Sequence, residues 1–178
     1  GGGQDGGDAI CVAGLRAESG VQEQLPFLGM HENKVDRKGR VSVPASFRQV
    51  LADQSFQGIV CFLSYRVDAI EGCGMNFMTE LSNSVADIDL FSDAQEDLSA
   101  TLFSTSHPLA WDSGGRVQLP PDLLEAAGIT DTAAFAGMGK TFRIWEPARL
   151  AAFQAERRGQ AKSKGLTLPL SGKRGGEG

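Results

Sequence analysis

One nine-residue motif occurs twice in this chain, and this repeat constrains the fold more than any other feature. Residues 36–44 read DRKGRVSVP and residues 112–120 read DSGGRVQLP, so each shared residue of the second copy stands 76 positions after its counterpart. Both copies lead into a short segment with apolar residues at helical spacing, at 45–51 and 122–128. We therefore expect two similar modules in tandem.

The shared motif predicts a tight turn followed by a half-buried strand. Gly39 and Gly115 supply the positive φ that a tight turn needs, and Val or Leu then alternates with a polar residue. The proline that closes each copy, Pro44 or Pro120, is expected in the first turn of the following helix.

The acid and the arginine of the motif are close enough to interact. Asp36 precedes Arg40 by four residues, and Asp112 precedes Arg116 by the same number. Each carboxylate can accept hydrogen bonds from the turn amides or pair with the guanidinium group. This favours a structural role for the two aspartates, whereas Arg40 is a candidate for binding a partner.

Further elements are predicted around the two motifs. Strands are expected at 58–64, 74–77, 133–136 and 141–145, and helices at 79–84, at 93–103 and from 147 to about 157. Ser92 with Gln95 three residues later resembles a capping box, which marks the start of a helix connecting the two halves. Each half then consists of a strand, a turn, a strand, a helix and a strand pair.

The charge is unevenly distributed along the chain. A formal net charge of -5 argues mildly against binding to nucleic acid. Residues 31–50, however, contain five bases against two acids, residues 66–100 contain one base and eight acids, and residues 107–127 contain one base and three acids. The first motif therefore lies in a basic patch and the second does not. The bases of the patch are Lys34, Arg37, Lys38, Arg40 and Arg48.

Signals for catalysis or metal binding are weak. Residues 139–141, Gly-Lys-Thr, match the end of a phosphate-binding loop, but they lie between two predicted strands, which favours a hairpin turn. His31 and His107 have no second ligand at a recognised metal spacing, so we expect structural roles for both, with no metal and no cofactor.

The three cysteines favour a reducing compartment. Cys11, Cys61 and Cys73 form no CxxC pair, and their odd number does not suit a disulfide framework, so we expect buried small side chains. No apolar run approaches the roughly 18 residues of a membrane helix. Residues 9–15 are flanked by acids where a signal peptide has bases. We expect a cytoplasmic protein that does not associate with membranes.

Over about residues 27–157 the chain closely resembles the MraZ family of bacterial transcriptional regulators. The resemblance rests on both motifs, on residues 27–33 (FLGMHEN) before the first, and on residues 127–129 (AGI) and 142–145 (FRIW) after the second. It implies an α+β, mostly β fold, in which two AbrB-like swapped-hairpin modules form a pseudo-twofold barrel with short flanking helices. The expected division is a disordered extension at 1–26, modules at 27–85 and 106–157, a connecting helix at 86–105 and a basic flexible tail at 158–178.

The resemblance also implies a function. It is that of a sequence-specific regulator, not an enzyme, which binds double-stranded DNA in the nucleoid as a ring-like homo-oligomer. Such a regulator represses its own division and cell-wall operon through repeated promoter elements. The DNA-contacting base of the family maps onto Arg40, with Lys38, Arg37 and Lys34 nearby and Arg116 as the counterpart. The second motif lacks the flanking lysine, which puts its DNA contact in doubt.

Two alternatives remain open at this point. An AbrB-like antitoxin would bind both DNA and a toxin, but it would need one module per chain rather than two. A small nucleotide-binding enzyme is the other alternative, and residues 139–141 are its only support in the sequence.

Overall fold

The computed structural model describes residues 25–88 and 92–165. In chain order the elements are β1 (Met30–Lys34), β2 (Arg40–Ser42), α2 (Ala45–Val50), β3 (Gly58–Leu63), β4 (Ile70–Cys73), α3 (Met75–Ala86), α4 (Asp93–Leu98), the π-helical segment η1 (Ser99–Phe103), β5 (His107–Ala110), β6 (Arg116–Gln118), α5 (Pro121–Ala127), β7 (Thr132–Gly137), β8 (Phe142–Trp145) and α6 (Pro147–Lys164). All the strand pairs are antiparallel, and the predicted α+β class, rich in strands, is confirmed.

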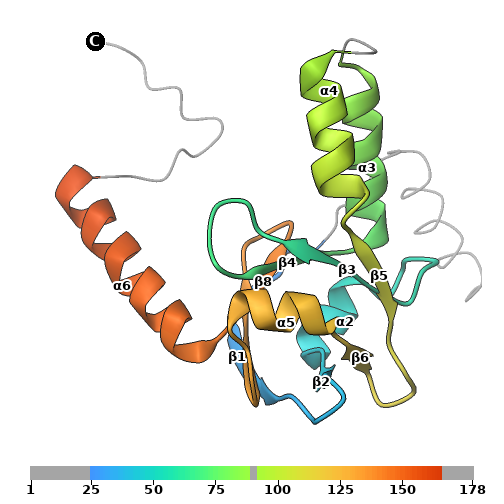
Figure 1. The fold of residues 1–178 in the computed structure, drawn as a ribbon. Helices are drawn as coiled ribbons and strands as arrows, with labels where there is room; N and C mark the ends of the chain where they lie inside the picture. Colours follow the sequence, from blue (N-terminus) through green and yellow to red (C-terminus); the bar gives the residue numbers. More distant parts are fainter. Residues whose placement is uncertain (1–24, 89–91, 166–178) are drawn as a thin grey trace, which may run out of the picture.

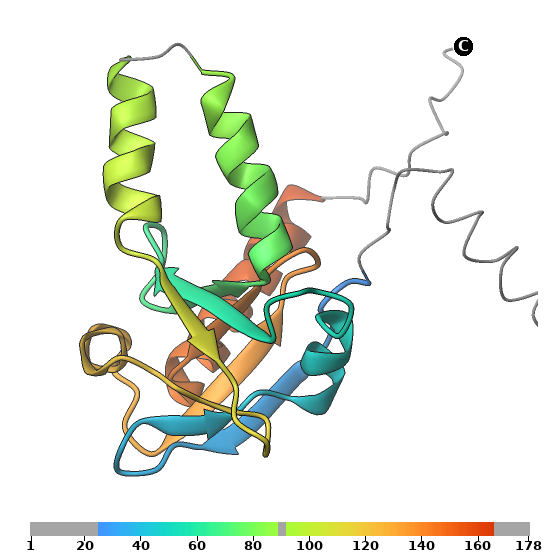
Figure 2. The same cartoon turned by 90° about the vertical axis from the view of Figure 1, so that its right-hand side faces the viewer.

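The two halves contain the same order of elements. The series β1, β2, α2, β3, β4 and α3 of the first half matches β5, β6, α5, β7, β8 and α6 of the second. Between them lie α4 and η1, where the connecting helix is expected, and Ser92 caps α4 by accepting a hydrogen bond from the backbone N–H of Gln95 at 3.2 Å. Figures 1 and 2 show α3 and α4 side by side, projecting away from the sheet.

The halves exchange strands. The larger sheet has the order β1-β7-β8-β4-β3-β5, and the second sheet is a ribbon of β2 and β6. Replacing every strand of the larger sheet by its counterpart reproduces this order in reverse, which is the expected pseudo-twofold relation. The expected barrel does not close among the described strands, because β1 and β5, the two edge strands of the larger sheet, do not pair with each other. After β1 the chain turns towards β2, and Val35 forms an isolated bridge with Val41.

The core lies between the larger sheet and the ribbon. Phe27 packs on Phe47 and Phe142, with ring centroids 5.2 and 4.9 Å apart. Val41 and Val117, the central pair of the ribbon, are buried against the same cluster. Burial of this apolar surface stabilises the fold and fixes the position of the ribbon.

An ion pair lies at the pseudo-twofold centre of the larger sheet. Glu71 of β4 stands opposite Arg143 of β8, and these two residues are each other's counterparts in the repeat. Arg143 Nε donates to Glu71 Oε1 at 2.9 Å, and the two side chains are 11% and 17% exposed. Pairing of two first halves would place glutamate opposite glutamate, which is destabilising. The charges therefore favour pairing of unlike halves.

The neighbouring positions add complementary shapes. Gly72 of β4 stands opposite Phe142 of β8, and a Cβ atom on Gly72 would lie 2.3 Å from the Phe142 ring. Ile144 is the counterpart of Gly72 in the second half, so pairing of two second halves would press Phe142 against a branched side chain. Only the pairing of unlike halves provides space for the ring.

Two predicted boundaries in the first half are corrected. Residues 74–77 were expected to form a strand, but the strand is β4 and ends at Cys73, while α3 begins at Met75 and includes the predicted helix at 79–84. The reason is tertiary packing, because the helical conformation buries Met78 and Val85 on one face. Four residues of alternating polarity do not distinguish the two conformations.

Other boundaries are corrected in the second half. The final helix was expected to end near Arg157 but α6 continues to Lys164, so residues 158–164 are helical rather than part of a flexible tail. Gly165 ends it in the left-handed conformation, with φ 60°. The remaining tail and nearly all of the extension predicted at 1–26 lie outside the described residues.

Pro44 and Pro120 occupy the N-cap position, one residue before the first helical turn.

If the ion pair specifies the pairing of unlike halves, reversing one charge should destabilise the protein and reversing both should restore it. Arg143→Glu should lower the free energy of unfolding by about 2–3 kcal/mol, somewhat less than for a fully buried pair. The double variant Glu71→Arg with Arg143→Glu should recover most of this loss in urea unfolding. Losses that simply add in the double variant would show that the two side chains do not interact.

Candidate nucleic-acid interface

The ribbon has one buried face and one exposed polar face. Arg40 of β2 stands opposite Gln118 of β6, and Ser42 stands opposite Arg116. These four side chains alternate with the buried valines and therefore share the outer face. Arg40 and Arg116 are diagonal neighbours, with Cα atoms about 7–8 Å apart in such a pair. The exchange of strands thus brings one arginine from each half to a single surface.

The first turn, residues 36–40, is organised by its carboxylate. Asp36 Oδ1 accepts hydrogen bonds from the backbone N–H groups of Lys38 and Arg40, both at 2.9 Å, and Arg40 Nε donates to Oδ2 at 2.7 Å. Gly39 has a φ of 84°, as predicted. The two interactions that the spacing allowed, with turn amides and with the guanidinium group, are therefore present together.

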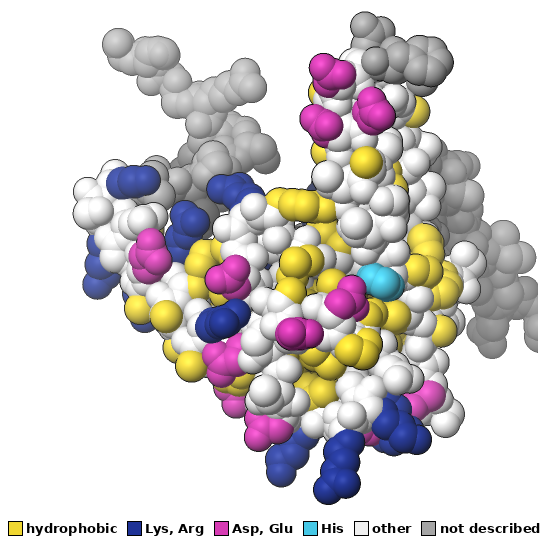
Figure 3. Space-filling model, viewed as in Figure 1, with side chains coloured by type: hydrophobic (Ala, Val, Ile, Leu, Met, Phe, Trp, Pro, Cys, Tyr) yellow, Lys and Arg dark blue, Asp and Glu magenta, His cyan; other side chains and the backbone are white. Residues whose placement is uncertain are grey.

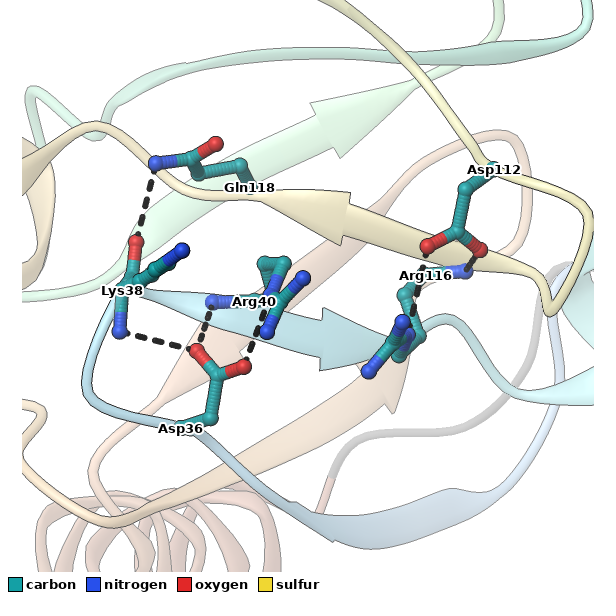
Figure 4. Close-up of polar contacts among 6 residues, drawn as sticks. All are labelled: Asp36, Lys38, Arg40, Asp112, Arg116 and Gln118. Atoms are coloured by element: carbon teal, nitrogen blue, oxygen red, sulfur yellow. Dashed lines mark hydrogen bonds and ion pairs between the residues drawn. The ribbon is translucent and has the colours of Figure 1, made fainter.

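The second turn, residues 112–116, repeats this arrangement. Asp112 Oδ1 accepts from the backbone N–H groups of Gly114 and Arg116 at 2.8 and 3.0 Å, and Arg116 Nε donates to Oδ2 at 3.2 Å. Gly115 has a φ of 78°. Figure 4 shows the two ion pairs at opposite ends of the ribbon.

Hydrogen bonding lowers the pKa of both turn carboxyls below the ordinary value of 3.8. For Asp36 the main cause of the lowered pKa is the backbone N–H of Arg40. Desolvation opposes it, and the Arg40 guanidinium and the N–H of Lys38 lower the pKa further. For Asp112 the main cause is the backbone N–H of Arg116. Both groups are ionised at neutral pH and hold their arginines in place.

Each turn is attached to the other half of the chain. The backbone N–H of Leu119 donates to the carbonyl oxygen of Gly39 at 2.9 Å, and that of Val43 donates to the carbonyl oxygen of Gly115 at 3.0 Å. Gln118 Nε2 also donates to the carbonyl oxygen of Lys38 at 3.0 Å. The two turns and the ribbon therefore form one rigid unit.

The predicted basic residues surround this unit. Arg37 and Lys38 are exposed at the tip of the first turn, and Lys34 is exposed at the end of β1. Figure 3 shows Lys and Arg side chains at the end of the molecule that carries β2 and β6 and also along α6, and acidic side chains at the far end of α4. The polarity predicted along the sequence is also a polarity in space.

One base of the predicted patch lies elsewhere than its sequence position suggests. Arg48 of α2 reaches the second turn, where a Cβ atom on Gly115 would lie 2.6 Å from the Arg48 Cζ. Arg48 Nε donates to the carbonyl oxygen of Val43 at 3.1 Å. Because the halves are exchanged, a base counted with the first motif in sequence is a neighbour of the second in space. Local sequence gives no signal for this placement.

Comparison with known proteins identifies the family. Residues 102–165 match the family model described as "MraZ protein, putative antitoxin-like". The transcriptional regulator MraZ of Gluconacetobacter diazotrophicus is 40% identical over 153 residues, which cover 84% of this chain and 96% of the relative. The chain belongs to the MraZ family of transcriptional regulators.

Other MraZ relatives match a similar share of the chain. The transcriptional regulator MraZ of Parvibaculum lavamentivorans is 45% identical over 131 residues, 73% of this chain and 81% of the relative. That of Pelagibacter ubique is 39% identical over 142 residues, 80% and 92% of the two chains. Membership of the MraZ family makes this chain a DNA-binding transcriptional regulator, and this part of the function predicted from its sequence is confirmed.

Two of the cysteines, His31 and residues 139–141, which the sequence also singled out, lie in or against the core or in a turn. Cys61 and Cys73 are buried, as predicted, and burial raises the pKa of both thiols, that of Cys73 to about 12, while Cys11 lies outside the described residues. The His31 ring packs edge-on against Phe47, and residues 139–141 lie in the turn between β7 and β8. The predicted hairpin turn is thus confirmed, although β8 begins at Phe142 and not at residue 141.

Two kinds of feature are absent from the described ranges. Within residues 25–88 and 92–165, no three His, Cys, Asp or Glu side chains are grouped closely enough to hold a metal ion. Among the helices of those ranges, none combines the length and the apolar character needed to cross a membrane.

The lowered pKa of Asp36 gives a prediction with a definite sign. A carboxyl whose pKa is lower in the folded state stabilises the fold above its unfolded pKa, and this contribution is lost as the pH falls through the folded pKa. The difference in melting temperature between the wild type and Asp36→Asn should therefore be greatest near neutral pH and shrink below pH 3.8. Asp68→Asn, in the exposed β3–β4 loop, controls for the loss of a charge. A difference that does not change with pH would contradict this account of the turn.

Proposed function

We propose that this MraZ family member binds double-stranded DNA by placing the β2–β6 ribbon in the major groove. The observation that carries the proposal is the outer face of the ribbon, where Arg40 and Arg116 project from two paired strands. The major groove, about 12 Å wide, admits a two-stranded ribbon. Two buried valines beneath this face keep the ribbon from moving when it binds.

The ion pairs support a role for both arginines in contacting DNA. In each, Nε is used by the turn aspartate, while the terminal nitrogens have no hydrogen-bond acceptor within the described part of the chain. A guanidinium group held in this way is oriented for two parallel hydrogen bonds to a guanine edge or a phosphate. Arg37, Lys38 and Lys34 are placed to bind the adjacent phosphates, which position the protein without specifying sequence.

We infer further that the chain acts by binding alone, on chromosomal DNA in the cytoplasm. The buried, protonated thiols and the hairpin at residues 139–141 support this, because neither offers a nucleophile or a phosphate cradle. The antitoxin alternative is less favoured, since the two halves of one chain complete each other's sheet without a second subunit.

The small size of the ribbon supports a homo-oligomer, expected to be a ring, that binds several promoter repeats at once and represses its own operon. One ribbon offers only two arginines and the bases near them, so a single contact with DNA should be weak. Linked copies gain avidity when the spacing of the DNA sites lets them bind together.

If the ribbon is the DNA-binding surface, Arg40→Ala should reduce affinity by about 10- to 100-fold. Arg116→Ala should also reduce it, but by less, because the second turn has no counterparts of Arg37 and Lys38. Both variants should flatten the dependence of affinity on salt. Arg66→Ala, in the exposed β3–β4 loop away from the ribbon, is the matched control (Figure 1). Gel-shift titrations over a salt series, with a melting curve for each variant, measure these effects. Unchanged affinity in Arg40→Ala would contradict the proposal.

The proposal for several repeats is tested by their spacing. Inserting about 5 bp, half a helical turn, between two repeats rotates one site to the opposite face of the DNA. Binding should weaken sharply in a gel shift, whereas an insertion of about 10 bp should restore much of it. Equal affinity for all spacings would exclude simultaneous binding by linked ribbons.

A further inference from the structure

The two ends of the ribbon are covered by different side chains. At the second turn, the Arg48 guanidinium lies over Gly115, as described above. At the first turn, the position equivalent to Arg48 is Leu124 of α5, whose Cδ1 would lie 3.2 Å from a Cβ atom on Gly39. The backbone of the ribbon is pseudo-twofold symmetric, but the side chains over its two turns differ. One turn is covered by a cation and the other by an apolar group.

This difference compensates for a difference between the turns themselves. The first turn has its own bases, Arg37 and Lys38, whereas the second has Ser113 and Gly114 at those positions. Arg48, which comes from the first half of the chain, supplies a positive charge to the end that lacks one. Each end of the ribbon then has at least one cation in addition to its ion-paired arginine.

We propose that Arg48 is a DNA-contacting residue of the second turn and binds a backbone phosphate beside Arg116. This inference rests on the proposed function of the ribbon. Arg48 is half-buried, and its Nε is held by the Val43 carbonyl oxygen. Its terminal nitrogens have no acceptor in the described ranges, and a planar guanidinium group can bind phosphate through two of its donors.

The glycine of the second turn is part of this arrangement. Any side chain on Gly115 would collide with Arg48, because the Cζ, Nε and Nη1 atoms lie 2.6–2.8 Å from an ideal Cβ position. The guanidinium group lies flat on the turn and is pre-organised, so little conformational entropy is lost when it binds DNA. A lysine, whose ammonium group is not planar, would not pack in the same way.

The test compares Arg48→Gln with Arg149→Gln. Arg149 has the same local arrangement in another place: its Nη1 donates to the Ala127 carbonyl oxygen at 3.1 Å, and its Cζ would lie 2.9 Å from a Cβ atom on Gly128. It is associated with the end of α5 opposite β6, away from the ribbon (Figure 1). Both substitutions remove one charge and one guanidinium group stacked on a glycine.

The measured quantity is the slope of the logarithm of DNA affinity against the logarithm of salt concentration. For each bound ribbon, Arg48→Gln should reduce this slope by about 1, which corresponds to one phosphate contact, and Arg149→Gln should leave it unchanged. An equal slope for Arg48→Gln and the wild type would overturn the proposal. If Arg40→Ala also left binding unchanged, the proposed function of the ribbon would fail as well. An effect of Arg40→Ala without one of Arg48→Gln would remove only the role of Arg48.

A reciprocal variant keeps the proposal testable if Arg48→Gln does not fold. Leu124→Arg would place a guanidinium group over Gly39, in the position that Arg48 occupies over Gly115. It should steepen the salt dependence by about 1 for each bound ribbon. Leu124→Met, which changes the shape but not the charge, should have no such effect. A folded Leu124→Arg variant that binds DNA with the wild-type slope would contradict the idea that this position faces a phosphate.

Discussion

The pairing of each half of the chain with the other determines how the larger sheet and the ribbon are built. Among the strands of the described residues, those that pair within one half are β3 with β4 and β7 with β8, whereas the ribbon and three further pairings of the larger sheet join the two halves. The β2–β6 ribbon therefore exists only in the complete fold. Specific pairing of unlike halves, supported by Glu71 with Arg143 and by Gly72 with Phe142, is what places Arg40 and Arg116 on one surface.

The fold also determines how the charged side chains are distributed over the surface. The net charge of -5 would not indicate a partner with many phosphates. The fold separates the charges, because the acidic helix α4 lies at one end of the molecule and the ribbon with its bases at the other (Figure 3). Local rather than net charge then determines how the protein meets DNA, and the acids at the far end favour one orientation during the approach.

Both turns of the ribbon can be predicted from the sequence, because the turn motif uses residues with strong local preferences. Gly39 and Gly115 adopt a positive φ, and each aspartate accepts hydrogen bonds from donors that lie within four residues of it in the sequence. Features that depend on packing were predicted less well. The start of α3 at Met75 is decided by burial of its apolar face, and the position of Arg48 by the exchange of strands. Neither has a signal within its own segment of sequence.

Photo-crosslinking can show whether one DNA molecule contacts both halves of the chain at the ribbon. A photo-crosslinking amino acid would be introduced at Ser42, in the first half, at Ser113, in the second, and at Asn83 on α3 as a control; all three are exposed. Irradiation with a promoter fragment should crosslink the variants at 42 and 113 and leave the control uncrosslinked. Crosslinking from the control position, or from neither ribbon position while DNA is bound, would contradict the account.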